Sequence, residues 1–163
     1  MLARIRFVVP LLLLTVGCAT AYQPTGLGGG YSDTQLAPDI FRVVFRGNQY
    51  TAPERVQDFA LLRASELALQ DGFACFALID ESNTVIASTF NTPAQANTTG
   101  SGVINGNTVN YDENTTYYPS QTYTFYKPNT GLLIKAFKSK PDGIFTLDAE
   151  FLQQSLRAKY QIK

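Results

Sequence analysis

A strongly patterned helix between two apolar segments constrains the fold of this chain more than any other feature. The segment Ile40–Phe45 is rich in β-branched and aromatic residues, and Phe73–Ile79 is a continuous apolar run, so both are typical of strands. Between them, apolar residues recur at helical spacing, at Val56, Phe59, Ala60, Ala64 and Leu67. A strand, a helix and a strand in quick succession allow a right-handed crossover, which would make the two strands parallel.

Both ends of this helix carry sequence signals. Thr51 is an N-cap candidate, Pro53 stands in the first turn, and Glu54 lies three residues after Thr51, which is the pattern of a capping box. Gly72 follows the last apolar position and can adopt the left-handed conformation that ends many helices. We therefore expect one long helix between Thr51 and Gly72.

The later apolar segments predict further strands. Residues 80–83 have the composition of a turn, and a strand is expected over 84–90. Residues 122–126 and 132–137 predict a hairpin, with its turn at 128–131.

The C-terminal segment predicts a second helix. Asp148 can cap it, and its apolar stripe consists of Phe151, Leu152, Leu156 and Tyr160. Together these elements predict an α+β fold: a small, mostly antiparallel sheet with one long helix after the first strand, a C-terminal helix, and a protruding β-ribbon or loop.

A long polar stretch lies between Asn91 and Thr122. Of its 32 residues, 20 are Asn, Thr, Gly, Ser or Gln. Polar low-complexity segments are often disordered, but the dipeptide Asn105-Gly106 lies between β-forming residues, which is a strong hairpin signal. We favour a protruding β-ribbon over residues 91–122, with a floppy loop as the alternative.

Three tyrosines make this stretch the candidate ligand-binding region: Tyr111, Tyr117 and Tyr118. Aromatic faces beside amides can hold a sugar by stacking, and an exposed strand can hold an extended peptide by strand addition. The alternative is that the tyrosines only pair across the strands of a ribbon.

The N-terminus has the pattern of a secretory signal. Arg4 and Arg6 precede the apolar run Phe7–Val16, which is too short to span a bilayer. The run ends at Gly17-Cys18 and resembles the lipobox of bacterial lipoproteins, which implies cleavage after Gly17 and lipid attachment to Cys18. Cleavage after Ala21, which would give a soluble periplasmic protein, is the alternative.

These observations divide the chain into three parts. Residues 1–17 are the expected lipoprotein signal peptide, and residues 18–37 are the expected lipidated cysteine and flexible Gly-rich tether. Residues 38–163 are expected to form a single domain. Cys75 lies in an apolar run, so we expect a buried core thiol.

The composition excludes several kinds of activity. The chain has no His, which rules out Ser-His-Asp and Cys-His catalysis and His-containing zinc sites. Thirteen basic and thirteen acidic residues argue against a nucleic-acid binder. The adjacent acids Asp80-Glu81 and Asp112-Glu113 would point to opposite faces of a strand, whereas glycoside cleavage needs facing carboxylates. We therefore expect no catalytic residues, no cofactor and no metal.

Four segments of the chain carry a resemblance to a family of uncharacterised proteobacterial envelope lipoproteins. They are Tyr31–Thr34, Phe41–Asn48, Arg55–Ala64 and Phe125–Pro128, and the resemblance extends over most of residues 22–163. It implies an address rather than an activity. In such lipoproteins, Ala19 after the lipidated cysteine implies sorting to the outer membrane, facing the periplasm.

The expected function is therefore that of a non-catalytic binding or scaffolding module, tethered to the membrane through an N-terminal lipid. Its expected partner is an envelope protein or peptidoglycan. The alternatives are a soluble periplasmic glycan- or peptide-binding protein and an envelope hydrolase.

Overall fold

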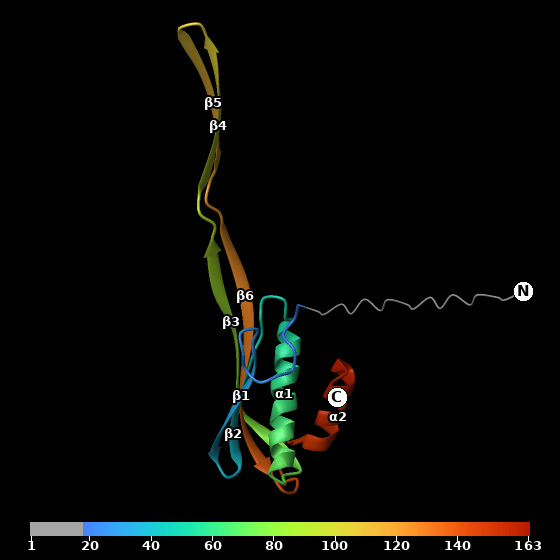
Figure 1. Cartoon of the computed structure of the whole chain (residues 1–163). Helices are drawn as coiled ribbons and strands as arrows, with labels where there is room; N and C mark the ends of the chain where they lie inside the picture. The colour runs from blue at the N-terminus through green and yellow to red at the C-terminus, as the bar shows by residue number, and fades with distance from the viewer. Residues whose placement is uncertain (1–17) are drawn as a thin grey trace, which may run out of the picture.

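The computed structural model describes residues 18–163. The predicted signal peptide, with its cleavage point at Gly17, lies outside the described residues. The elements in chain order are β1 (Gly30–Ala37), β2 (Ile40–Arg46), α1 (Pro53–Gln70), β3 (Cys75–Asn91), β4 (Gln95–Asn105), β5 (Thr108–Tyr118), β6 (Thr122–Phe137), β7 (Leu147–Asp148) and α2 (Ala149–Tyr160) (Figure 1).

The main sheet has five strands in the order β1-β2-β6-β3-β7, and all its pairs are antiparallel. Strands β2 and β3 both pair with β6, so they are parallel to each other, as the strand–helix–strand pattern predicts. β6 nevertheless lies between them. The α+β prediction is confirmed at this level, with two helices and antiparallel sheets.

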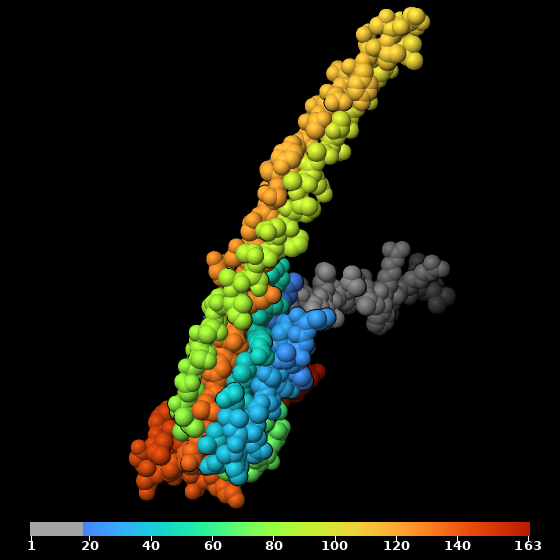
Figure 2. Space-filling model, turned by 90° about the vertical axis from the view of Figure 1, so that its left-hand side faces the viewer, coloured from blue at the N-terminus to red at the C-terminus, as the bar shows by residue number. Residues whose placement is uncertain are grey.

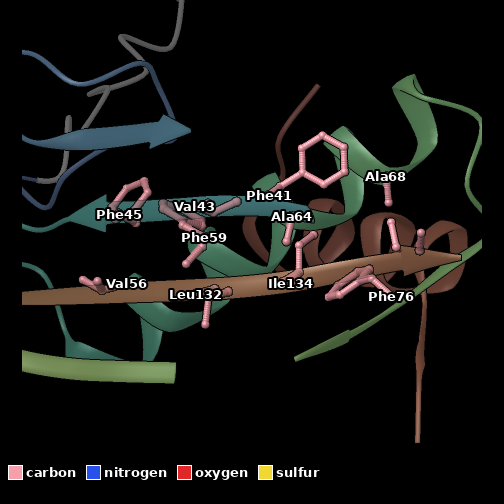
Figure 3. Close-up of a cluster of buried hydrophobic side chains, with 13 residues drawn as sticks. Phe41, Val43, Phe45, Val56, Phe59, Ala64, Ala68, Phe76, Leu132 and Ile134 are labelled. Atoms are coloured by element: carbon pink, nitrogen blue, oxygen red, sulfur yellow. The ribbon is translucent and has the colours of Figure 1, made fainter. Parts of the chain in front are cut away.

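The core lies between this sheet and α1 (Figure 3). One face of β2 contributes Phe41, Val43 and Phe45, and α1 contributes the predicted apolar stripe. α2 packs mainly against α1 rather than against the sheet, so the opposite face of the sheet is left uncovered in the described part of the chain (Figure 2). Cys75 is 5% exposed, which confirms the prediction of a buried thiol.

The two ends of α1 differ in how well the sequence predicted them. The predicted capping box is wrong: Ala52 is the N-cap residue, and among the described residues no side chain caps it. The Thr51 hydroxyl instead contacts Thr20 and Asn48. Gly72 ends the helix as predicted, with φ of 77°. The Phe73 amide donates to the Ala68 carbonyl at 2.8 Å, which is a Schellman closure.

α2 begins as predicted, since the Asp148 carboxylate accepts a hydrogen bond from the Phe151 amide at 2.8 Å. The predicted stripe is only partly right. Leu156 is buried, but Phe151 is 72% exposed, because the helix contacts α1 through a narrower face than the pattern suggested.

The predicted turns at residues 80–83 and 128–131 are wrong. Both segments lie inside the continuous β3–β6 hairpin, where Asn83 pairs with Thr130. The Thr130 hydroxyl donates to the Asn83 side-chain carbonyl at 2.6 Å, so strand pairing satisfies polar groups that would otherwise favour turns. A register shift between Leu78 and Asp80 accommodates the change from the buried to the exposed part of β3.

The expectation of a flexible tether over residues 18–37 is also wrong. Residues 30–37 form β1, in which Tyr31 pairs with Phe45. The preceding turn is closed by hydrogen bonds between the backbones of Gln23 and Tyr31 and of Gly26 and Gly29. The domain therefore begins well before residue 38, and the glycines form a turn rather than a linker.

Candidate functional site

The most unusual surface of the protein is the hairpin formed by β4 and β5, residues 95–118, which we call the arm. It continues the direction of β3 and β6 away from the two helices (Figures 1 and 2). At its base, the Thr92 amide donates to the Gln121 carbonyl at 2.9 Å, and the Gln121 amide donates to the Thr92 hydroxyl at 3.0 Å. The arm thus extends the paired strands β3 and β6, which we call the main hairpin.

The arm has a regular register and no core. Gln95 pairs with Tyr118 and Asn105 pairs with Thr108, with no register shift between them. The connecting turn is Gly106-Asn107, with Gly106 at φ 61°, as expected for a two-residue hairpin loop. Every residue of both strands is exposed, although an isolated two-stranded hairpin is only marginally stable in water.

The two faces of the arm differ in chemistry. Because side chains alternate along a strand and direct partners share a face, the register assigns each residue to one face. One face, the aromatic face, carries Ala96, Thr98, Gly100, Gly102, Ile104, Val109, Tyr111, Glu113, Thr115 and Tyr117. The other, the amide face, carries four asparagines among its residues, at Asn97, Asn105, Asn110 and Asn114.

The structure does not bring the three candidate tyrosines together. Tyr111 and Tyr117 share the aromatic face, but six residues of extended strand separate them by about 20 Å. Tyr118 lies on the amide face. All three side chains are more than half exposed, so they line an extended surface rather than a single site.

Gly100 and Gly102 allow the Tyr111 ring to lie flat across the arm. A Cβ atom built on Gly100 would clash with the Tyr111 ring, and one on Gly102 would stand 3.7 Å from it. Tyrosines placed over strand glycines in this way help to fix the register of a sheet. The packing of the Tyr111 ring beside both glycines could have been predicted only from the register of β4 against β5.

The second candidate region is the segment around Cys18, which is held against the body. Cys18 is exposed, and its carbonyl accepts a hydrogen bond from the Asn48 side chain at 2.7 Å. Thr20 is 3% exposed. Its amide donates to the Thr51 hydroxyl at 2.8 Å, and its hydroxyl donates to the Gly28 carbonyl at 2.8 Å and accepts from the Asn48 amide at 2.9 Å.

Tyr22 continues this attachment. Its ring packs edge-on against Phe59, with centroids 5.4 Å apart, and its hydroxyl donates to the Glu66 carboxylate. Burial, together with the neighbouring Glu66 charge, raises the pKa of Tyr22 well above its usual range. The phenol therefore stays protonated at neutral pH and remains a hydrogen-bond donor.

Glu66 is the buried centre of this attachment, and its burial could not be predicted from the sequence, because it lies outside the apolar stripe of α1. It is 6% exposed and accepts from Arg157 of α2 at 2.7 Å and from Arg63 at 3.3 Å. Arg63 also reaches Asp33 of β1 at 2.8 Å. One carboxylate therefore links α1, α2 and the segment after Cys18.

The first described segment of the chain joins the body at the end from which β3 and β6 extend toward the arm (Figure 1). The Gly47 amide donates to the Pro128 carbonyl at 2.8 Å, which joins the loop that holds Cys18 to β6. Pro128 is separated from Gln121, at the base of the arm, by seven residues of extended strand, about 23 Å.

The acidic pairs lie where strands separate their side chains. Asp80 and Glu81 belong to β3, and Asp112 and Glu113 belong to β5, so the members of each pair point to opposite faces. Glu81 accepts hydrogen bonds from Gln57 and Asn83. Within residues 18–163, no group of three or more His, Cys, Asp or Glu side chains is placed to hold a metal ion.

No helix of the described chain is both long and apolar enough to cross a membrane. Comparisons of the chain with protein-family models, curated proteins and solved structures find no match.

Proposed function

We propose that this protein is a bacterial cell-envelope lipoprotein that acts as a non-catalytic binding or scaffolding module, with the arm as its contact surface. The observation that carries the proposal is a two-stranded arm with both faces exposed and with large apolar side chains along it, including Ile104, Val109, Tyr111 and Tyr117. Ile104, Val109 and Tyr111 are neighbours on one face of the arm, and exposed apolar side chains grouped in this way mark an interaction site. The separation of the tyrosines favours an extended contact over a single sugar-stacking platform.

The packing of Thr20 supports attachment at Cys18 over cleavage after Ala21. Cleavage after Ala21 would remove Thr20, whose hydroxyl accepts from the Asn48 amide and from the Thr51 hydroxyl. Only the hydrogen bonds between Asn48 and Thr51 would then remain. A typical intramolecular hydrogen bond contributes about 0.5–1.5 kcal/mol to stability, so the loss of Thr20 would weaken the loop before α1. Cleavage before Cys18 keeps Thr20 in the mature protein and places the lipid beside the domain.

The proposed location is the periplasmic side of the outer membrane, with the lipid on Cys18 as the anchor. Because residues 20–37 are packed, the body would lie close to the bilayer instead of moving on a long tether. The arm would then be presented in a restricted orientation, which lowers the entropy cost of meeting an extended partner.

A variant with a shortened arm tests this function. Asn91 and Thr122 are direct partners at the end of the main hairpin, so residues 92–121 can be replaced by Asn-Gly, which closes a two-residue turn. We expect chemical crosslinking in intact cells to capture protein partners of the full chain and none of the shortened chain. The thermal midpoint should stay within about 3 °C, because the arm buries no core residue.

Unchanged crosslinking by the shortened chain would show that the contact surface lies elsewhere. Substituting Tyr50, which is 63% exposed on the body, by alanine is the matched control for removing exposed aromatic surface. Crosslinking of this control should equal that of the unaltered chain.

A further inference from the structure

We infer that the arm binds the arm of a second copy of this chain, edge to edge, so that β5 of one copy pairs with β4 of the next in a continuous antiparallel sheet. This inference rests on the proposed role of the arm as a contact surface and names its occupant. It follows from the two free edges of the arm, their hydrogen-bonding pattern and their charge.

The outer edges of β4 and β5 lack the features that normally prevent strand pairing. Natural edge strands are protected by lysines, inward-pointing charges, prolines or bulges. From Ser82 to Tyr111 the chain contains no charged side chain, and the register of the arm has no bulge. Within β4 and β5 there is no Pro, Lys or Arg, and Asp112 and Glu113 of β5 are the only charged side chains. All of the β4 edge and most of the β5 edge are therefore open to strand pairing.

The two edges are also complementary in register. The residues that flank a two-residue loop exchange hydrogen bonds, and the alternate residues direct their amides and carbonyls away from the partner strand. The outward residues are therefore 96, 98, 100, 102 and 104 on β4 and 109, 111, 113, 115 and 117 on β5, at matching levels. Two arms that point the same way can thus form a full ladder without any shift.

Such a sheet keeps the two chemistries of the arm separate. All outward residues belong to the aromatic face, and direct partners across the seam share a face, so each added copy extends one aromatic face and one amide face. Adding strands gives the hairpin the three or more strands that an independently stable sheet needs. Anchors at Cys18 would hold the arms in the common orientation that this pairing requires.

The charge of the arm sets how the pairing depends on salt. Asp112 and Glu113 are opposite Ser101 and Gly100 within one arm, and in an unshifted neighbour they would meet the same two residues. Acids of adjacent copies are then two strand spacings apart, about 9.6 Å. This separation is close to the Debye length of about 10 Å at 0.1 M salt, so association should increase with ionic strength.

Disulfide trapping with single cysteines tests this seam in the full-length protein in cell membranes. Asn97 and Thr116 are partners within one arm, and their backbone amides and carbonyls point toward each other. Across the seam they become a non-hydrogen-bonded pair, whose Cα separation of about 4.5 Å permits a disulfide. We expect cells that produce Asn97→Cys and Thr116→Cys copies together to form a disulfide-linked dimer under mild oxidation, and cells that produce either copy alone to form little.

Two controls accompany this experiment. The chain without an added cysteine accounts for Cys18, and Cys75 is buried. A mixture of Tyr50→Cys and Asn97→Cys copies tests random collision, because Tyr50 is exposed on the body. If the Asn97→Cys and Thr116→Cys mixture forms no more dimer than each variant alone, the inference is overturned.

A charge variant provides a second readout that does not depend on a disulfide. The double substitution Asp112→Asn and Glu113→Gln should raise the dimer fraction of detergent-purified protein in sedimentation experiments at low salt. A decrease would overturn the inference, because it would mean that the acids bind a basic surface, such as the uncovered sheet face with Arg42 and Arg46. If purified protein stays monomeric while the shortened-arm variant still loses its crosslinks in cells, the arm binds another protein and only this inference fails.

Discussion

The substitution Cys18→Ser is expected to abolish fatty-acid attachment to this protein. A thiolate is the stronger nucleophile and accepts the diacylglycerol, whereas a serine hydroxyl does not become appreciably ionised near neutral pH. Two or more acyl chains are what make membrane anchoring stable, so the loss of membrane anchoring should be complete rather than partial. Incorporation of labelled palmitate and the intact mass of the mature N-terminus measure the fatty-acid attachment.

The other cysteine provides the matched control for this substitution. Cys75 is buried in the core, so Cys75→Ala should keep palmitate incorporation unchanged. For the unaltered chain, the mass should correspond to a diacylglyceryl group on Cys18. A mature chain that begins at Tyr22 without a lipid would instead support the soluble periplasmic alternative.

Replacing Phe59 by alanine is expected to lower the free energy of unfolding by about 3–5 kcal/mol. The Phe59 ring is 2% exposed and meets three aromatic rings, those of Tyr22, Phe45 and Tyr160, at centroid distances of 5.4, 5.1 and 4.8 Å. The substitution removes these contacts and leaves a cavity beneath both α2 and the segment after Cys18. Total stabilities of about 5–15 kcal/mol are usual for single domains, so the loss is a large fraction.

Urea unfolding followed by circular dichroism measures this change, and Phe151→Ala is its control. Phe151 is 72% exposed on α2, and exposed substitutions usually change stability by less than about 0.5 kcal/mol. Equal losses for the two variants would contradict the assignment of Phe59 to the core and of Phe151 to the surface.

The elements with strong local signals could be predicted from the sequence. The apolar spacing of Val56, Phe59 and Ala64 located α1, and Gly72 located its end, because no residue with a side chain adopts a positive φ as readily. Asp148 likewise marked the start of α2, since its carboxylate satisfies a free amide of the first turn. These features depend only on neighbours in the chain.

The predictions that were wrong concern residues whose structure depends on partners distant in the sequence. Residues 80–83 and 128–131 have turn-forming compositions, but each segment becomes straight strand because it pairs with the other, 47 residues apart at Asn83 and Thr130. Thr51 fits a capping box, but its hydroxyl is taken by Thr20, 31 residues away. The burial of Glu66 depends on Arg157, which lies 91 residues further along the chain.

The candidate site was only partly accessible to sequence reasoning. Composition indicated the region of the arm and its three tyrosines, but the assignment of Tyr111 and Tyr117 to one face and Tyr118 to the other requires the register of β4 against β5. The packing of Thr20 bears on where the mature chain begins. It likewise could not be predicted from the sequence, because it depends on contacts with the loop before α1.

Site-specific photocrosslinking tests most directly whether the arm is the contact surface. A photoreactive phenylalanine analogue can replace Tyr111 on the arm or Tyr50 on the body, and the two positions are nearly equally exposed, at 66% and 63%. Irradiation of intact cells should give a discrete higher-mass adduct from position 111 and none from position 50. Adducts of equal yield at both positions, or an adduct only at position 50, would show that the arm is not the contact surface.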